Sequence, residues 1–207
     1  EEISALQLQF GQNLLAETDA FKLIIDKEEN LAGISESLKA SALKRGEKDS
    51  TTSGKWVFGL DNPSVMPFLQ QSSNKDLRKQ IFEAYLNRCN NNNEFDNKDV
   101  IKKLVDLRLK RAKLLGFENY AQYQLEERMA KTPEAVYELL NKIWTPALAA
   151  ARKELTDMSA IAVSEGNTAP LESSDWRFYF EKSMAKKFNL NDSELRPYFK
   201  LENVREG

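Results

Sequence analysis

Apolar side chains recur every three or four residues along most of this chain, the spacing that places them on one face of an α-helix. The first series predicts a helix at the N-terminal end and contains Ile3, Leu6, Phe10 and Leu14. Further helices are predicted over 35–46, 63–70, from 73 to the asparagine run at 90–93, 98–115, 119–129, 133–162, 173–188 and 192–199. The predicted fold class is mainly α, a multi-helix domain with at most a short strand pair.

Residues that favour helix ends support several of these boundaries. Thr132 followed by Pro133 has the form of an N-cap and a first helical residue. Ser73 and Asp76 have the spacing of a capping box, with Asp in place of the usual Glu. Pro146 lies inside the longest apolar series, so we expect that helix to kink near this residue.

On each helix the apolar stripe marks the face that we expect to be buried. The residues expected inside are Leu38 and Ala42; Leu77, Ile81, Ala84 and Tyr85; Ile101, Leu104, Val105, Ala112 and Leu115; Val136, Leu139, Leu140, Ile143, Ala147, Ala151, Leu155, Met158 and Ala162; and Trp176, Phe180 and Met184, with Tyr179 and Ser183 beside them.

The stretch WVFGLDNPSVMPFL interrupts the helical pattern. Residues 56–60 are strand formers, and Asn62 followed by Pro63 predicts a helix cap and start. A lone strand is unstable, and its candidate partner is FKLIID at 21–26, which by itself could be a strand or a helix continuation. The polar segment 47–55 predicts an exposed loop and a possible sub-boundary within the chain.

The absence of histidine is the most informative feature of the composition. It excludes catalytic triads that use histidine and zinc sites built on it. A net charge of −2 over 207 residues argues against nucleic-acid binding by bulk electrostatics. No apolar run approaches the length needed to cross a bilayer, so no membrane partner is predicted. The one cysteine, Cys89, cannot form an internal disulfide and has no activating neighbour in the sequence, so we interpret it as a bystander thiol.

Three groups of charged residues are candidates for a functional site. The adjacent acids Glu28-Glu29 and Glu126-Glu127 point about 100° apart on a helix, so a solvated surface is favoured over a shared site. The basic stretch 98–113 is compatible with a phosphate or RNA face, but a helix with one solvated charged side is favoured because aromatic residues are not interleaved. Asp175, beside Trp176, is interpreted as a helix-start cap rather than as a substrate contact.

Longer segments resemble a known family. The stretch LLGFENYAQYQLEERMAKTPEAVYELLNKIWTPALAAARKEL (114–155) is similar to the helical region of bacterial peptidyl-dipeptidases (dipeptidyl carboxypeptidases), in the thimet oligopeptidase family of zinc metallopeptidases. Similar segments in the same order are LDNPSVMPFLQQS, LRKQIFEAYLNR, DWRFYFEK and LRPYFKLENVREG. Ser174 departs from the family pattern, which has Trp directly before the Asp of this aromatic motif, whereas Trp176 and Tyr179 match it.

The resemblance implies a mainly helical shell around a deep channel that admits short peptides. It also implies a zinc ion held by an H-E-x-x-H helix and a downstream glutamate, with the motif glutamate as general base. A chain without histidine cannot carry that helix, so no catalytic or metal residue is transferred here and the substrate-binding residues stay unknown.

The sequence thus predicts that residues 1–207 are the non-catalytic helical part of a larger peptidyl-dipeptidase-like enzyme, inactive alone, that binds no zinc itself. The start at Glu1 without an initiator Met and the end at NVREG are likewise interpreted as signs that the sequence is a piece of a longer protein. The expected partners are short peptides, through the parent enzyme, and a C-terminal catalytic domain of the same polypeptide. The expected compartment is the cytoplasm, with the periplasm as the alternative. A helical protein-interaction scaffold without enzymatic activity is the competing hypothesis.

Overall fold

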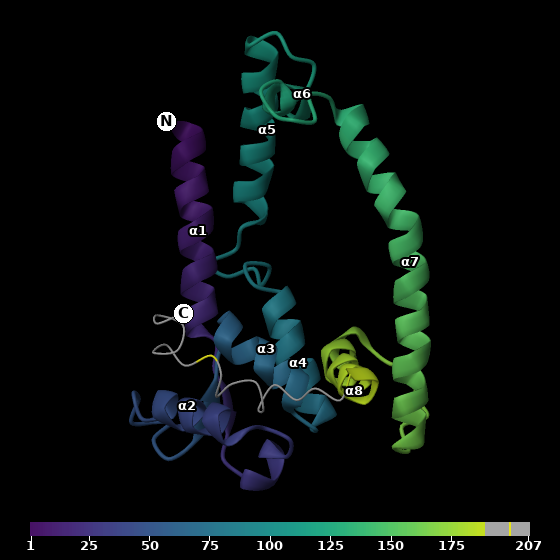
Figure 1. Cartoon of the computed structure of the whole chain (residues 1–207). Coiled ribbons are helices and arrows are strands. Elements are labelled where there is room, and N and C mark those ends of the chain that lie inside the picture. Colours follow the sequence, from purple (N-terminus) through teal and green to yellow (C-terminus); the bar gives the residue numbers. More distant parts are fainter. Residues whose placement is uncertain (189–198, 200–207) are drawn as a thin grey trace.

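A computed structural model describes residues 1–188 and 199 of the chain (Figure 1). Its α-helices are α1 (Glu2–Ala20), α2 (Glu36–Gly46), α3 (Asn62–Gln71), α4 (Lys75–Leu86), α5 (Lys98–Leu114), α6 (Tyr120–Leu125), α7 (Pro133–Ser164) and α8 (Trp176–Phe188). The other elements are strands β1 (Leu23–Ile25) and β2 (Trp56–Phe58) and the 3-10 turns η1 (Glu28–Leu31) and η2 (Ser173–Asp175). The mainly α prediction is confirmed, whereas the predicted turn at 192–199 lies outside the described residues except for its last position.

The helices form a base and an arch (Figure 1). The base contains α2, α3, α4 and α8, and α1 rises from it beside α5. The arch follows the chain through α5, α6 and α7, and α7 returns to the base, where it packs against α8. None of the described helices is both long and apolar enough to cross a lipid bilayer.

The main core lies in the base and joins the strand pair to the surrounding helices. Strand β1 pairs antiparallel with β2, in the register Leu23↔Phe58 and Ile25↔Trp56, which confirms FKLIID as the strand partner. Phe58 and Phe68 are fully buried and meet edge to face, with ring centroids 4.7 Å apart. The core is completed by Leu23, Ile25, Leu31, Ile34, Leu38, Ala42, Leu60, Val65, Leu69 and Ile81.

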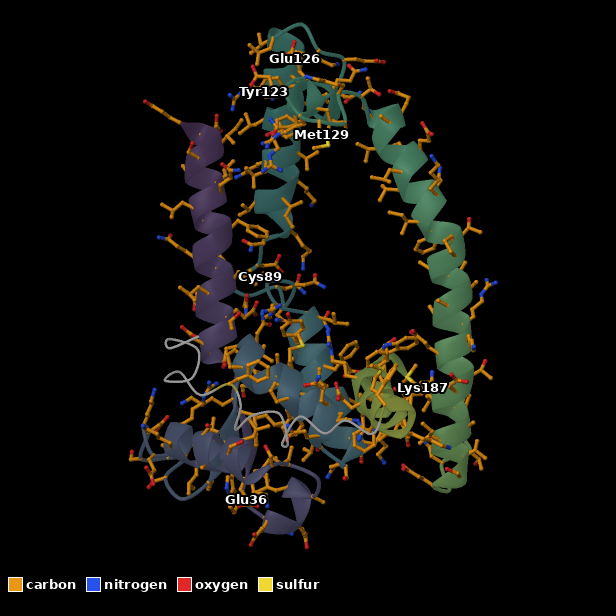
Figure 2. The ribbon with its side chains drawn as sticks, viewed as in Figure 1. Glu36, Cys89, Tyr123, Glu126, Met129 and Lys187 are labelled. Atoms are coloured by element: carbon orange, nitrogen blue, oxygen red, sulfur yellow. The ribbon has the colours of Figure 1, made fainter. Side chains whose placement is uncertain are left out.

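A smaller core joins α7 to α8. Met158 and Ala162 on α7 pack against Phe178 and Tyr179 on α8. The contact is flanked by ion pairs, including Lys187 with Asp157 at 2.7 Å (Figure 2). The last turns of α7 are thereby fixed to the base.

Two helix starts differ from the sequence prediction by one residue. The N-cap of α3 is Asp61 and not Asn62, because the Asp61 carbonyl accepts the first helical hydrogen bonds from Ser64 and Val65. The N-cap of α4 is Asn74 and not Ser73, and its side chain accepts from the backbone N–H of Leu77. The predicted Thr132 cap of α7 is confirmed, since its hydroxyl accepts from the N–H of Ala135.

Several predicted boundaries and faces are wrong. Helix α6 ends at Leu125, and turns replace the predicted helix as far as residue 129. On α5, Leu104 and Ala112 are buried as predicted, but Ile101, Val105 and Leu115 are exposed and Val100 is buried instead. On α8, Phe178, Tyr179 and Ser183 are buried, whereas Met184 is exposed and Trp176 and Phe180 are half-buried. By contrast, the prediction that the helix over 133–162 continues across Pro146 is confirmed by α7.

Candidate functional site

A buried ion pair joins α4 to the start of α8. Arg78 is 2% exposed and Asp175 is 0% exposed, and Arg78 Nη2 lies 2.6 Å from Asp175 Oδ1. Arg78 Nη1 also donates to the carbonyl of Ser72 at 2.7 Å, and the guanidinium lies 4.2 Å from the centre of the Phe178 ring. Charge, hydrogen bond and ring contact all act on the Arg78 side chain, so this junction fixes the position of α8 on α4.

Asp175 also organises the turn that precedes α8. Its Oδ2 accepts from the N–H of Glu172 at 3.1 Å, and the Glu172 side chain caps the same turn in return, which forms a capping box. Lys75 approaches Glu172 at 3.5 Å and Asp175 at 3.6 Å. The prediction that Asp175 caps a helix start is confirmed, and a carboxylate with no exposed surface is not placed to contact a substrate.

Two polar atoms at this junction lack partners within the described residues. They are Arg78 Nε and the hydroxyl of Ser174, which is itself buried. Ser174 stands where the resembled family has Trp, so a small side chain lies at the start of the helix. The sequence pattern gave no sign of Arg78, because an arginine next to Leu77 on a helix is usually solvated.

A second polar junction ties the α4–α5 loop to α1. Glu17, near the end of α1, is buried and accepts hydrogen bonds from the backbone N–H of Cys89 and from the side chains of Asn91 and Asn93, the latter two at 2.7 and 2.8 Å. Burial acts to raise the pKa of Glu17, but these hydrogen bonds outweigh it and the pKa is lowered from its ordinary value. The asparagine run, predicted only to break a helix, therefore donates to a buried carboxylate.

The same loop is anchored one turn further back along α1. Asn97 is buried, accepts from the side chain of Asn13 at 2.9 Å and donates to the carbonyl of Phe10 at 3.1 Å. Sequence alone could not assign these partners, because they lie far away along the chain. Together with Glu17 they hold α5 beside α1.

Cys89 lies between the ends of α1 and α4 (Figure 2) and is buried. Its backbone has a left-handed φ of 58°, which is unusual for a residue other than glycine. Burial, and then the hydrogen bond and charge of Glu17, raise the pKa of the thiol to about 11. The interpretation of Cys89 as a bystander is consistent with these surroundings.

We expect Cys89 in the native chain to react slowly with a disulfide reagent at about pH 8, because raising the pKa from 9.0 to about 11 lowers the thiolate fraction about 100-fold. Labelling should become fast once urea unfolds the chain. The measurement is the rate at which the reagent releases its chromophoric thiolate, followed by absorbance. Equal rates with and without urea would show that the thiol is neither buried nor held protonated.

The basic helix, α5, has a solvated face on which three lysines are paired with acids. Ion pairs join Lys98 to Asp96 at 2.7 Å and Lys110 to Asp106 at 2.6 Å, and a further pair joins residues 99 and 102. Arg108 and Arg111 instead lie against Tyr120 and Tyr123 of α6, each at 5.3 Å from the ring centre. Sequence spacing could not reveal these tyrosines, because α6 folds back onto the end of α5.

The paired acids do not form sites. Glu28-Glu29 lie in η1 and Glu126-Glu127 follow α6, and all four side chains are exposed, as predicted. Among the described residues no group of three or more His, Cys, Asp or Glu is placed to hold a metal ion. The described donor set, which contains no histidine, does not fit a zinc site.

A cavity of about 740 Å³ lies where the end of α1 meets the loop after α2. Two ion pairs lie in its lining, Lys22 with Asp49 at 2.7 Å and Arg45 with Asp61 at 2.5 Å. A second cavity, of about 480 Å³, lies between α3, α4 and α8 and is lined by Trp176, Phe180 and other residues. Asp19 and Lys48 also line the first cavity, so its lining carries three acidic and three basic side chains.

The fold and its junctions define a helical framework in which buried polar contacts join distant segments. Its sequence matches peptidase family M3 over residues 68–207. The chain therefore belongs to peptidase family M3, which confirms the resemblance seen in the sequence.

Curated relatives match nearly the whole chain. Organellar oligopeptidase A, chloroplastic/mitochondrial, of Arabidopsis thaliana is 34% identical over 215 residues, which cover 100% of this chain and 27% of the relative. Dipeptidyl carboxypeptidase of Escherichia coli is 32% identical over 203 residues, covering 98% of this chain and 30% of the relative. Oligopeptidase A of Haemophilus influenzae is 32% identical over 209 residues, which cover 99% of this chain and 30% of the relative. The chain thus spans less than a third of the length of these relatives.

Proposed function

We propose that this chain is the non-catalytic helical portion of a zinc metallopeptidase that hydrolyses short peptides, and that it forms part of the wall of the substrate channel. The parent enzyme releases dipeptides from a free C-terminus. Residues 1–207 act as one helical part, with a possible sub-boundary at 47–55. The zinc ion and the catalytic residues belong to a C-terminal catalytic domain of the same polypeptide, and no residue of this chain is assigned to either role.

One observation carries this proposal. The alignment with the dipeptidyl carboxypeptidase of Escherichia coli runs through 98% of the chain but covers only 30% of that relative. A chain without histidine supports placing the zinc ligands in the remaining length. The arch of α5, α6 and α7 supports a role as wall rather than as reaction centre (Figure 1).

The proposed compartment is the cytoplasm, with the periplasm as the alternative. Neither nucleic acid nor membrane is proposed as a partner, because the basic residues of α5 are largely engaged by acids or tyrosines. The alternative function is a helical interaction scaffold without activity, and the following test distinguishes it from the peptidase.

The test compares one short peptide carrying a free C-terminus with the same peptide amidated. The longer polypeptide encoded by the same gene is expected to release a dipeptide from the free form only, and a chelator should abolish the reaction. The 207-residue chain alone should cleave neither peptide and bind no stoichiometric zinc. Internal cleavage of both peptides would overturn dipeptide release, and no hydrolysis by the zinc-loaded polypeptide would favour the scaffold.

A further inference from the structure

The middle of α7 is exposed on every side. Each residue from 137 to 147 is exposed, which amounts to about three turns of helix. Five of these residues are large and apolar: Tyr137, Leu139, Leu140, Ile143 and Trp144. Helices in proteins owe most of their stability to the packing of an apolar face, which this segment lacks among the described residues.

The exposed apolar residues continue a stripe that is buried further along the same helix. Leu140 precedes Met158 by 18 residues, since 158 − 140 = 18, and eighteen steps of about 100° are five full turns. Ile143 and Ile161 stand in the same relation, as do Trp144 and Ala162. One face of α7 therefore begins bare and ends packed against α8.

Within that stripe the contrast in exposure is large. Met158 and Ala162 are fully buried in the contact with α8, whereas Trp144 is 65% exposed. Contiguous exposed apolar surface rimmed by charged residues marks an interaction site in soluble proteins. Glu138 and Lys142, which pair with each other at 3.6 Å, lie about 160° and 200° round the helix from Leu140 and form a charged face opposite the stripe.

We propose that this bare stripe, defined by Leu140, Ile143 and Trp144, is the docking face for the remainder of the same polypeptide. The inference rests on the proposed function in one respect, that the chain is part of a longer protein. The relatives extend over more than three times the aligned length, so chain of sufficient size to cover the stripe is present in them. The buried end of the stripe is already covered by α8, a segment that follows in the same chain, and a later segment extends that packing.

Leu140 and Lys142 form the pair for the test, one on the stripe and one on the opposite face of α7. Both side chains are exposed, Leu140 at 52% and Lys142 at 75%, but they point about 160° apart. Each is replaced in turn by cysteine, Leu140→Cys and Lys142→Cys, in the 207-residue chain and in the longer polypeptide. Cys89 is buried and contributes little background, and labelling by a maleimide is located by peptide mass mapping.

Both cysteines are expected to label at similar rates in the 207-residue chain. In the longer polypeptide Leu140→Cys should label at least about 100-fold more slowly, because reaction then requires local opening, while Lys142→Cys keeps its rate. Leu140→Cys labelling equally fast in both proteins would overturn the proposal. Protection that grows with the concentration of the 207-residue chain would assign the face to a second copy, and protection that requires added peptide would assign it to substrate; either would also overturn it. Protection without any peptide hydrolysis would uphold the docking face while the proposed function fails.

Discussion

Replacing Asp175 by alanine is expected to lower the free energy of unfolding of the chain by about 3–5 kcal/mol. The substitution leaves the Arg78 guanidinium buried without its carboxylate partner, and a buried unpaired charge is costly. It also removes the acceptor for the N–H of Glu172 at the start of α8. The measurement is urea denaturation followed by circular dichroism, and Asp175→Asn, which keeps the shape, provides a second variant if the alanine protein does not fold.

Two controls separate a buried ion pair from charge loss in general. Asp106→Ala removes the exposed pair with Lys110 and should leave the denaturation midpoint unchanged. The double variant Arg78→Met, Asp175→Leu removes both charges and should recover much of the stability lost by the single change. A double variant as unstable as Asp175→Ala would show that packing around the site, and not the unpaired charge, causes the loss.

The local features of the fold were predictable where one short segment specifies them. The Thr132 cap and Pro133 start are adjacent in the sequence, and their geometry follows from backbone chemistry. The pairing of 21–26 with 56–60 was predictable because a strand needs a partner and few segments could supply one. The cap of α3 was misplaced by one residue because Asp61 and Asn62 are both good cap residues.

Contacts between distant segments were not predictable. Arg78 and Asp175 are 97 residues apart, and nothing near Arg78 in the sequence distinguishes it from a solvated arginine. The prediction that the apolar faces of α5 and α7 are buried was wrong for a related reason. An apolar period shows that a helix has a face to bury, but it does not show that the described chain supplies the cover. Leu139 and Leu140 were expected inside and are exposed.

In the candidate site, too, local features were predictable and contacts between distant segments were not. The interpretation of Asp175 as a cap depended only on adjacent residues in the sequence, and it is confirmed. The role of the asparagine run was missed, because its donors are satisfied by Glu17, more than seventy residues earlier in the chain. The asparagine run between α4 and α5 therefore donates to a carboxylate that no neighbouring residue in the sequence supplies.

Replacing Glu17 by glutamine is expected to lower the free energy of unfolding at neutral pH by about 2–3 kcal/mol, the usual worth of hydrogen bonds to a charged acceptor. Glutamine keeps the volume but presents an amide N–H₂ to donors that already point at the site: the N–H of Cys89 and the side chains of Asn91 and Asn93. The α4–α5 loop should loosen, and Cys89 should label faster in the native protein. Urea denaturation and thiol labelling measure the two effects.

The pH dependence identifies the carboxylate as the cause. Because the pKa of Glu17 is lowered in the folded chain, its stabilisation is present above the ordinary pKa of 4.5 and is lost as the pH falls through the lowered value. The difference in unfolding free energy between wild type and Glu17→Gln should therefore shrink as the solution is acidified, since the protonated glutamate is also a weaker acceptor. Glu2→Gln, an exposed change near the other end of α1, is the control and should leave the profile unaltered. A difference that stays constant down to the acid transition would mean that the loop is held by its shape, and not by the charge of Glu17.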